Sequence, residues 1–564
     1  MAESTPGHHD ERPLARWRVW LVVGLLFVAW TPGLRSIPVT DRDEARFAQA
    51  TRQMLSSGDF VRITFQDEPR HKKPAGVHWL QAATVGAATF VGIADAGDIW
   101  PYRIPSVIGG ALAVLLTGWF ARRLFDREVA LLAAASLGLS ALLVVETHLA
   151  TTDAALLACV VATQGSMWRI YVGSRNDESI PGFAPYIMWA ALGASILLKG
   201  PVGPIVALLT AASLVLADRR VGWIRHTRPL PGALVAAAIV APWLIAVQRA
   251  TDGAFLREAM GDDFFAKLRE AVESHGGWPG YHLVLSPVTF WPGSIFAALG
   301  LALGWRRRGE PATRFLLAWL IPSWIAFELA PTKLPHYVLP LFPPLAILIA
   351  AAVAELESSV ERLRSTPVRA GVVFWGLLTI GLSFSLGLLP RWTDGALWWS
   401  ALIASGLLGL VAAIGVTTLA WRSRPRAAIW MATTTSAGVN LIAFGLIAPS
   451  IDAPWVSQRL ATTLGPPSDQ IVAVGYHEPS LVFEMNGQVG LVGPARAAEL
   501  VRGRTGPLTV LVDDRRLDAF ETALGERGVV PPPPSQRVDG LQYSKGRRTS
   551  VSIFQFAWTP APSD

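Results

Sequence analysis

Apolar segments, each close to the length that crosses a bilayer, recur along most of this chain of 564 residues. A transmembrane helix needs about 20 consecutive residues that are mostly apolar. The pattern therefore predicts an all-α polytopic membrane protein with about 13 spans. These runs begin near residues 17, 102, 129, 152, 184, 202, 229, 286, 314, 336, 369, 396 and 427.

The last part of the chain has a different pattern. Gln470 to Gly475, Pro507 to Val512 and Thr549 to Phe556 are typical of short strands, and Leu517 to Arg527 is typical of a helix. We therefore expect a small α/β domain after the membrane region. The predicted divisions are an N-terminal tail at 1–16, a transmembrane domain at 17–449 and the α/β domain at 450–564.

Composition supports the membrane assignment. The chain is 51% hydrophobic and 16% charged, with a mean hydropathy of +0.38, whereas about a quarter of the residues in soluble domains are charged. A net charge of +7 could suggest nucleic acid binding, but the basic residues form short clusters between apolar runs, as the positive-inside rule expects of cytoplasmic loops. Cys159 is the only cysteine, which excludes an intrachain disulfide and a thiolate metal site.

The basic clusters also predict the orientation. Residues 17–30 could form a signal peptide, but no small-residue cleavage site follows, so we interpret them as a retained first helix that starts in the cytoplasm. If the ambiguous segment 76–94 stays on the outer side, as an interfacial or re-entrant helix, all six later basic clusters fall inside. Outer segments then lie at about 35–100 and 249–285, and the region after 450 is also outside.

The predicted first outer loop gathers ionisable residues. It begins with Asp43, Glu44 and Arg46, and it ends with Lys72 and Lys73. Two simpler interpretations stay open, because the acids could cap an interfacial helix and the lysines could contact lipid headgroups.

More such residues follow on the same predicted side. Asp153 begins a helix, where the helix dipole favours an acid. Lys199 ends an apolar helix before a break at Gly200-Pro201, and a lysine beside exposed helix-start amides is a natural anion site. Simple snorkelling of Lys199 to the surface is the alternative. Later outer loops add His275, Lys333, His336 and Tyr337.

Carboxylates, lysines and histidines on one face suit the transfer of a sugar from a lipid phosphate. The departing phosphate is anionic, so cations and helix-start amides can stabilise it. A hydroxyl acceptor needs a carboxylate to take its proton and orient it. A polytopic transporter is the main rival, but transporters usually place ionisable residues near the midplane of repeated halves. A non-catalytic lipid-binding or assembly protein would not require both a carboxylate and several lysines.

Six stretches carry a resemblance to a known superfamily. The sequence resembles the lipid A aminoarabinose transferases and the bacterial relatives of the protein O-mannosyltransferases, which are GT-C glycosyltransferases. The resemblance covers about residues 20 to 345, with a weaker match at Glu478 to Phe483. The matching stretches are Asp43-Glu44-Ala45-Arg46-Phe47-Ala48, Met54 to Asp59, Lys73-Pro74 with Trp79-Leu80, Leu198-Lys199-Gly200, Ala241-Pro242-Trp243, and Lys333-Leu334-Pro335-His336-Tyr337 with Leu339-Pro340.

The resemblance implies a GT-C bundle with interfacial helices and an inverting transferase that uses a polyprenyl-phosphate sugar. It implies that Asp43 is the catalytic carboxylate, with Asp153 lining the cavity. The donor phosphate would be bound by Lys73, Lys199, Lys333 and Arg46. The remaining candidates for the substrate cavity are Glu44, Lys72, His275, His336 and Tyr337. The implied location is a bacterial inner membrane, with the site and the α/β domain on the periplasmic side.

Two departures leave the substrate open. Aminoarabinose transferases usually have an acid just before the loop lysine, where this chain has Lys72. They also have a His-Glu pair that aligns with Gly261-Asp262. No cofactor is certain, and if those positions bind a divalent metal in the relatives, its ligands are not kept here. The acceptor could be lipid A or lipopolysaccharide, another envelope glycan, or a protein.

Overall fold

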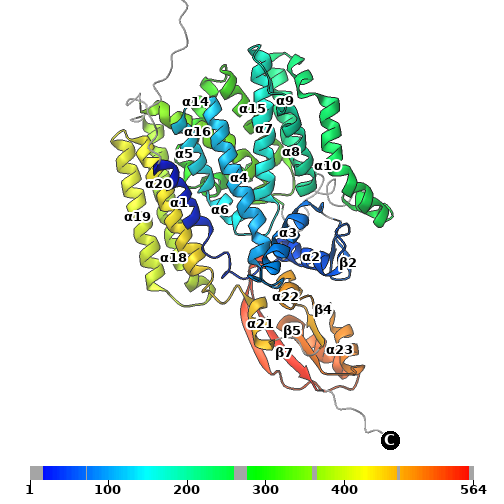
Figure 1. Ribbon diagram of the computed structural model, residues 1–564. Coiled ribbons are helices and arrows are strands. Elements are labelled where there is room, and N and C mark those ends of the chain that lie inside the picture. The colour runs from blue at the N-terminus through cyan, green and yellow to red at the C-terminus, as the bar shows by residue number, and fades with distance from the viewer. Residues whose placement is uncertain (1–16, 72, 260–275, 358–364, 466–469, 558–564) are drawn as a thin grey trace, which may run out of the picture.

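The computed structural model describes all residues except 1–16, 72, 260–275, 358–364, 466–469 and 558–564. Most of the helices run side by side in one bundle, and a small sheet domain lies against one end of it (Figure 1). We call this end of the bundle the sheet-domain end. The opposite end is called the basic end, for reasons given below.

The described helices match the predicted apolar runs. Eight of them are long and apolar enough to cross a membrane: α4 (Trp100–Leu124), α7 (Asp153–Arg175), α10 (Pro229–Ala250), α15 (Pro311–Leu329), η4 with α16 (Pro335–Leu356), α18 (Thr366–Thr393), α19 (Trp399–Trp421) and α20 with η5 (Pro425–Ile447). Shorter apolar helices are α1 (Trp17–Trp30), α8 (Ala184–Lys199) and α9 (Val202–Asp218). The chain is thus a membrane protein with many spans, and their number stays a prediction.

Two further runs form bent pairs. Helices α5 (Arg127–Gly138) and α6 (Ala141–Thr147) meet at 61°. Helix α13 (Tyr281–Thr289) meets the segment of η3 and α14 (Gly293–Arg306) at 119°. The first bend matters for function, because it turns the end of α6 toward the start of α7.

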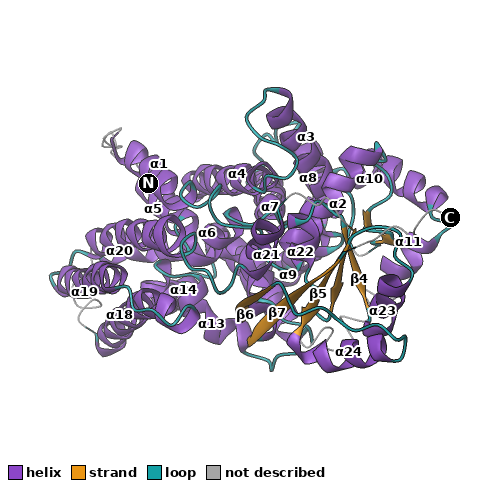
Figure 2. Ribbon diagram, turned by 90° about the horizontal axis from the view of Figure 1, so that it is seen from below, coloured by secondary structure: helices purple, strands orange, loops and turns teal. Residues whose placement is uncertain are grey.

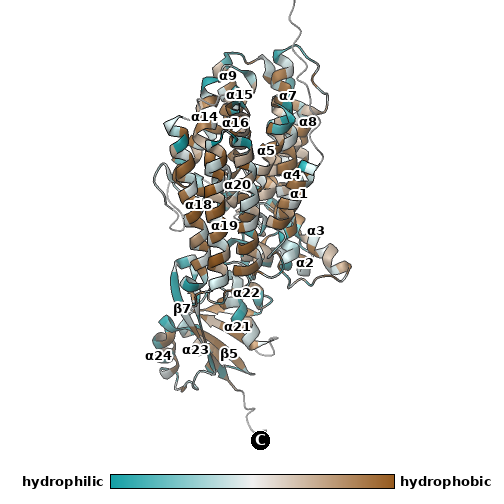
Figure 3. Cartoon of the chain, turned by 90° about the vertical axis from the view of Figure 1, so that its left-hand side faces the viewer, coloured by the Kyte–Doolittle hydropathy of each residue, from teal (hydrophilic) through white to brown (hydrophobic). Residues whose placement is uncertain are grey.

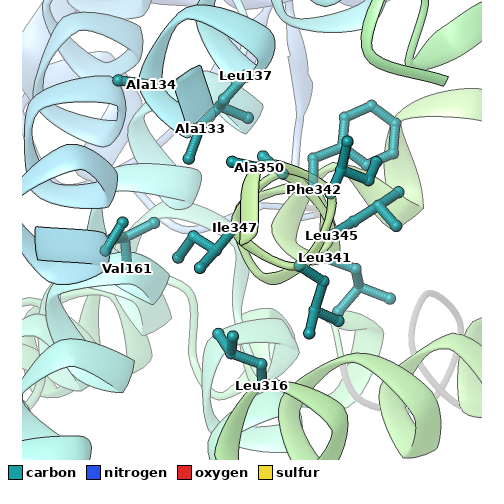
Figure 4. Close-up of a cluster of buried hydrophobic side chains, with 14 of the residues drawn as sticks. Ala133, Ala134, Leu137, Val161, Leu316, Leu341, Phe342, Leu345, Ile347 and Ala350 are labelled. Carbon is teal, nitrogen blue, oxygen red and sulfur yellow. The ribbon is translucent and has the colours of Figure 1, made fainter. Parts of the chain in front are cut away.

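The core surrounds helix α16 (Phe342–Leu356), which is apolar on every side. A helix of this kind is stable when it is buried. Figure 4 shows α16 with side chains of α5, α7 and α15 around it, among them Leu137, Val161 and Leu316. Peripheral helices instead expose apolar side chains such as Leu377 and Leu407, and Figure 3 shows that α18 and α19, which carry them, consist mostly of hydrophobic residues.

Basic residues gather at the end of the bundle that lies away from the sheet domain. Ion pairs there join Arg175 to Asp218 at 2.7 Å and Arg426 to Glu128 at 2.7 Å. Arg307 pairs with Glu355 at 2.8 Å. The 3-10 helix η1 (Gly222–Thr227) adds Arg225 at this end. These contacts agree with the prediction that the basic clusters share one face, although Arg362 and Arg364 lie outside the described residues.

The segment predicted to form the first outer loop lies at the sheet-domain end. It contains α2 (Asp43–Ser57), a hairpin of β1 (Thr64–Phe65) and β2 (Glu68–Pro69), and α3 (Gly76–Phe90). Seen from below, α2 lies beside the sheet domain, whereas α3 projects away from the strands (Figure 2). Helix α3 is not among the candidate spans in the described chain, and the interfacial placement of 76–94 stays a prediction. The short helix α11 (Ala254–Arg257) follows α10.

The C-terminal domain is a five-stranded mixed sheet with strand order β4-β3-β5-β7-β6. The strands are β3 (Gln470–Val474), β4 (Val489–Val492), β5 (Leu508–Asp513), β6 (Gln536–Gln542) and β7 (Arg547–Phe556). Strand β3 pairs in parallel with β4 and β5, and β7 pairs antiparallel with β5 and β6. The helices are α21 (Val456–Leu464), α22 (Pro479–Glu484), α23 (Pro494–Arg502) and α24 (Leu517–Gly525), joined by the 3-10 turns η6 (Asp514–Arg516) and η7 (Tyr543–Lys545). The predicted small sheet domain is confirmed.

Candidate active site

Several helix ends meet at the sheet-domain end of the bundle. Helix α2 begins at Asp43, α7 begins at Asp153 and α8 ends at Lys199. Helix α6 ends next to Glu146, and η4 carries His336. Residues that are far apart in the sequence thus contribute to one cluster, because the bundle places these helix ends on the same level.

Asp153 and Lys199 form the centre of the cluster. The Lys199 Nζ lies 2.5 Å from the Asp153 Oδ1, and the two side chains are 9% and 7% exposed. The same Nζ lies 5.4 Å from the centre of the Tyr337 ring. Each charge is also at the helix end that its sign favours. Gly200 then turns the chain with φ of 65°, which only glycine adopts readily.

Glu146 also belongs to this cluster, although it was not among the residues predicted from the sequence to form the site. Its buried carboxylate accepts a hydrogen bond from the Thr151 Oγ1 at 2.8 Å. The His336 Nδ1 lies 3.5 Å from the Glu146 Oε1. Glu146 also interacts electrostatically with Asp153 and Lys199. A signal was available in the sequence, because an acid within an apolar run on the same side as Asp153 is costly unless it has a partner or a role.

Asp43 is the accessible acid of the cluster. Its side chain is 57% exposed, and its Oδ1 lies 4.0 Å from the Arg46 Nη1 on the first turn of α2. Asp43 is close enough to Glu146 and His336 to interact electrostatically with both. Lys73 interacts in the same way with Asp153 and His336. The structure therefore brings seven of the predicted residues together: Asp43, Arg46, Lys73, Asp153, Lys199, His336 and Tyr337.

Glu44 has a different environment from its neighbour. It is 1% exposed, and the Arg103 guanidinium donates to both of its oxygens at 2.8 and 3.0 Å. Backbone amides of Thr40 and Ala150 donate to the same carboxylate at 2.8 and 2.9 Å. Burial opposes ionisation, but Arg103 and these donors outweigh it and hold the pKa of Glu44 below its usual range. Its geometry is that of an anchor for the loop, and the predicted role in the substrate cavity remains untested.

Lys333 connects two outer loops. Its Nζ donates to the carbonyl oxygens of Gly277 at 2.9 Å and Ala330 at 2.6 Å, and Gly276 and Thr332 form a β-bridge beside it. An ammonium has three donors, and two of the Lys333 donors are used by these carbonyl groups. The predicted residues Lys72 and His275 lie outside the described residues, as do Gly261 and Asp262. Within the described chain, no three His, Cys, Asp or Glu side chains form a metal-binding group.

Comparisons with known proteins show which sequences and folds this chain is similar to. The family model described as dolichyl-phosphate-mannose-protein mannosyltransferase matches residues 72–245. An undecaprenyl phosphate-alpha-4-amino-4-deoxy-L-arabinose arabinosyl transferase of Erwinia tasmaniensis is 29% identical over 55% of this chain and 54% of its own length. The protein of that name from Pseudomonas paraeruginosa is 30% identical over 60% of this chain and 59% of its own length.

The fold comparison covers nearly the whole molecule. The crystal structure of ArnT from Cupriavidus metallidurans bound to undecaprenyl phosphate has a TM-score of 0.75 and 20% identity, and covers 96% of this chain and 98% of that one. In fold this chain is similar to ArnT, and in sequence it is similar to the proteins named arabinosyl transferases. An oligosaccharyltransferase of Archaeoglobus fulgidus has a TM-score of 0.51 at 12% identity, over 93% of this chain. The chain spans about half to two thirds of the length of the curated relatives it matches.

This cluster is chemically suitable for the transfer of a sugar from a lipid phosphate. Lys73, Lys199, buried acids and a histidine interact with one another, and the accessible Asp43 carboxylate interacts with two of these groups, Glu146 and His336. Cations in this position can stabilise a leaving phosphate, and the accessible carboxylate can accept a proton. The roles of the individual residues stay predictions.

Proposed function

We propose that the protein is an inverting glycosyltransferase that moves a sugar from a polyprenyl-phosphate donor to an acceptor in the cell envelope. The observation that carries the proposal is the position of Asp43. It is an accessible carboxylate on a helix start, and it interacts electrostatically with Glu146 and His336, which both also interact with Lys199. The resemblance to arabinosyl transferases along the chain supports the same reaction.

Lys199 and Lys73 would bind the donor phosphate. Before the donor arrives, Asp153 neutralises Lys199, which lowers the cost of keeping a cation in this buried position. The phosphate then shares the Lys199 ammonium with Asp153. Arg46 and Lys333 complete the proposed set.

Asp43 would act on the acceptor. If the acceptor is a hydroxyl, the Asp43 carboxylate takes its proton while the oxygen bonds to the anomeric carbon. The bond between that carbon and the phosphate oxygen breaks, and the electron pair leaves with the polyprenyl phosphate. Attack opposite the leaving group inverts the anomeric configuration. If the acceptor is an anionic phosphate, Asp43 has only to orient it.

The first candidate for the acceptor is lipid A or another envelope glycan. The relatives named arabinosyl transferases match 55% and 60% of the chain, and the whole fold resembles ArnT. A protein acceptor is the second candidate, because the matching family model is described as a protein mannosyltransferase. The sugar is open, since Lys72 and Gly261-Asp262 depart from the aminoarabinose transferase pattern.

We derive no step that uses a metal ion. Where the resemblance expects an acid and a histidine, this chain has Lys72 and Gly261. A protonated lysine and a glycine side chain cannot serve as ligands. The residues present therefore do not fit that site.

We also propose that the site faces the periplasm across a bacterial inner membrane. The basic end of the bundle carries Arg175, Arg307 and Arg426, and cytoplasmic loops usually carry the excess of basic residues. The opposite end, with Asp43 and the sheet domain, would then be periplasmic.

The test uses purified full-length protein with synthetic polyprenyl-phosphate sugars. Lipid A and a serine-containing peptide serve as separate acceptors, and mass spectrometry measures the product. We expect one acceptor to gain one sugar, with its anomeric configuration inverted and polyprenyl phosphate released. Mass spectrometry of envelope lipids and glycoproteins from cells with and without the gene identifies the natural sugar. Retention of configuration, or transport of the donor without transfer, would contradict the proposal.

A further inference from the structure

The sheet domain contacts the first outer loop two residues before Asp43. The Ser480 Oγ and backbone N–H both donate to the Asp41 Oδ1, the latter at 3.3 Å. The Asp41 backbone N–H donates in turn to the Tyr543 hydroxyl at 2.5 Å. Asp41 is therefore bonded through its side chain and its backbone to two separate segments of the domain, α22 and η7.

The contact rests on a rigid part of the domain. Ser480 is 3% exposed, and its hydroxyl lies 2.6 Å from the Ser457 Oγ on α21. Glu478, which is also 3% exposed, accepts hydrogen bonds from Gln542 and from Ser544. Because these partners are buried and mutually bonded, they hold Ser480 and Tyr543 in place.

A second contact ties the domain to helix α2 itself. The Arg52 guanidinium donates to the Asn486 Oδ1 at 2.9 Å and to the Phe483 carbonyl at 3.0 Å. It also lies 4.6 Å from the centre of the Phe483 ring. The Gln66 side chain donates to the Val489 carbonyl at 2.6 Å. The domain is thus docked along the loop and cannot shift without moving α2.

Asp43 lies between two anchored residues. On one side Asp41 is bonded to the sheet domain, and on the other Glu44 is bonded to Arg103 of the membrane bundle. Between them Arg42 has φ of 65°. A non-glycine residue in this region persists where its surroundings hold it there. The direction in which the Asp43 side chain points therefore depends on the contacts of both Asp41 and Glu44.

We propose that Asp41 is a positioning residue, through which the C-terminal domain sets the place of the Asp43 carboxylate in the reaction. This inference rests on the proposed function, in which Asp43 acts on the acceptor. It gives the sheet domain a role in catalysis that requires no contact with either substrate.

The protonation of Asp41 suggests a conservative variant. Burial, with a smaller contribution from nearby Glu478, raises the pKa of Asp41 to about 7, while Ser480 and Arg42 act in the opposite direction. Near neutral pH a large fraction of the carboxyl group is protonated in the docked domain. Asparagine has the same shape and no charge, and its oxygen can still accept from Ser480.

The test compares full-length variants for turnover, donor binding and thermal stability. Asp41→Ala should lower kcat on the order of 10- to 100-fold, because misplacing a catalytic group by about 1 Å has effects of this size. Donor affinity should stay within about twofold, since Lys199 and Lys73 bind the donor in the proposed scheme and are held by other contacts. Asp41→Asn should recover most of the lost kcat. A purely structural role predicts that folding and donor binding fall together with turnover.

Serine variants provide matched controls and serve as the test if Asp41→Ala does not fold. Ser480→Ala removes the hydroxyl that donates to Asp41. Ser552→Ala removes an equally buried hydroxyl, 3% exposed, that donates to Asp514 inside the sheet domain. We expect Ser480→Ala to lower kcat by about three- to tenfold, because the backbone donor of residue 480 remains, and Ser552→Ala to leave kcat unchanged.

A double-mutant cycle decides whether Asp41 and Ser480 act together. The fold-loss of kcat in the double variant Asp41→Ala with Ser480→Ala should be clearly smaller than the product of the two single fold-losses. In Asp41→Ala with Ser552→Ala, the fold-loss should equal the product of the single fold-losses. Independent effects of Asp41 and Ser480, or an Asp41→Ala enzyme with normal kcat, would overturn the inference. If Asp43→Asn loses activity and Asp41→Ala does not, the positioning role fails while the proposed function stands. If Asp43→Asn is itself active, the assignment of Asp43 fails first.

Discussion

A buried aspartate forms an ion pair at each end of helix α7, and the two sites are built differently. At the basic end, the Asp218 carboxylate receives the Tyr171 hydroxyl at 2.5 Å and the Arg175 guanidinium at 2.7 Å, and Arg314 binds its other oxygen. At the sheet-domain end, Asp153 receives one ammonium, from Lys199, and lies close to another buried acid, Glu146. The two aspartate side chains are similarly buried, at 3% and 7% exposure.

The difference separates a structural site from a candidate reactive one. Asp218 is satisfied by three donors from α7 and α15, so it holds helix ends together and needs no further ligand. The cluster around Asp153 combines acids, cations and a histidine that do not saturate one another, and such groups are usual at functional sites. We therefore propose the second cluster, around Asp153, as the one that binds the donor phosphate.

Labelling tests whether the two ends lie on opposite sides of a membrane, and its effect should be all or none. Single cysteines at Gly276 and Gly503, in a Cys159→Ser background, should react with an impermeant thiol reagent in intact spheroplasts. A cysteine at Gly222, on the basic end, should react only after the membrane is opened. Labelling of Gly222 with protection of Gly276 would reverse the orientation.

Removal of the cation at the sheet-domain end should affect chemistry. A charge-assisted contact contributes roughly 1.5–3 kcal/mol, so Lys199→Ala should weaken donor binding and turnover about tenfold to a hundredfold. Kinetics with a polyprenyl-phosphate sugar measure both. Lys199→Ala alone leaves the buried Asp153 carboxylate without its partner, and adding Asp153→Asn removes that charge. The loss of donor binding and turnover should persist in this double variant. Recovery in the double variant would show that Lys199 only neutralises Asp153.

Removal of the acid at the basic end should affect stability instead. Asp218→Asn leaves Arg175 and Arg314 without their anionic partner, at side-chain exposures of 30% and 20%. Breaking a buried ion pair lowers the free energy of unfolding more than breaking an exposed one. Because solvent partly screens these two arginines, we expect the free energy of unfolding to fall by about 1–2 kcal/mol. The thermal unfolding midpoint in detergent should fall, while kcat per folded molecule stays normal. A loss of kcat at unchanged stability would contradict the structural assignment.

The helices were predictable because hydropathy determines which segments can lie in a bilayer. Each predicted run corresponds to a described helix or bent pair. The bends were not predicted, since a hydropathy window records composition and not direction. In the sheet domain, β6 was missed because Gln536–Gln542 is largely polar, and β4 because Val489–Val492 is only four residues long.

The site was predicted in part for a similar reason. Asp43 and Glu44 are adjacent in the sequence, and neighbouring helix residues point about 100° apart. One acid is therefore exposed while the other binds Arg103, and the sequence alone did not indicate which. Arg103 lies within an apolar run and was not considered as a partner. Asp41 was not selected either, because its contacts are with residues 480 and 543, more than 400 positions away.

The central claim, that Asp43 acts on the acceptor, is tested most directly by Asp43→Asn. Asparagine begins a helix about as well as aspartate, so folding and donor binding should be normal. A positioned base contributes typically 10²- to 10⁴-fold, and single-turnover transfer to a hydroxyl acceptor at saturating donor should slow by about that factor. With an anionic phosphate acceptor the loss should be smaller. Near-normal transfer to a hydroxyl acceptor by a stable Asp43→Asn enzyme would contradict the account, and Glu146 would become the next carboxylate to test.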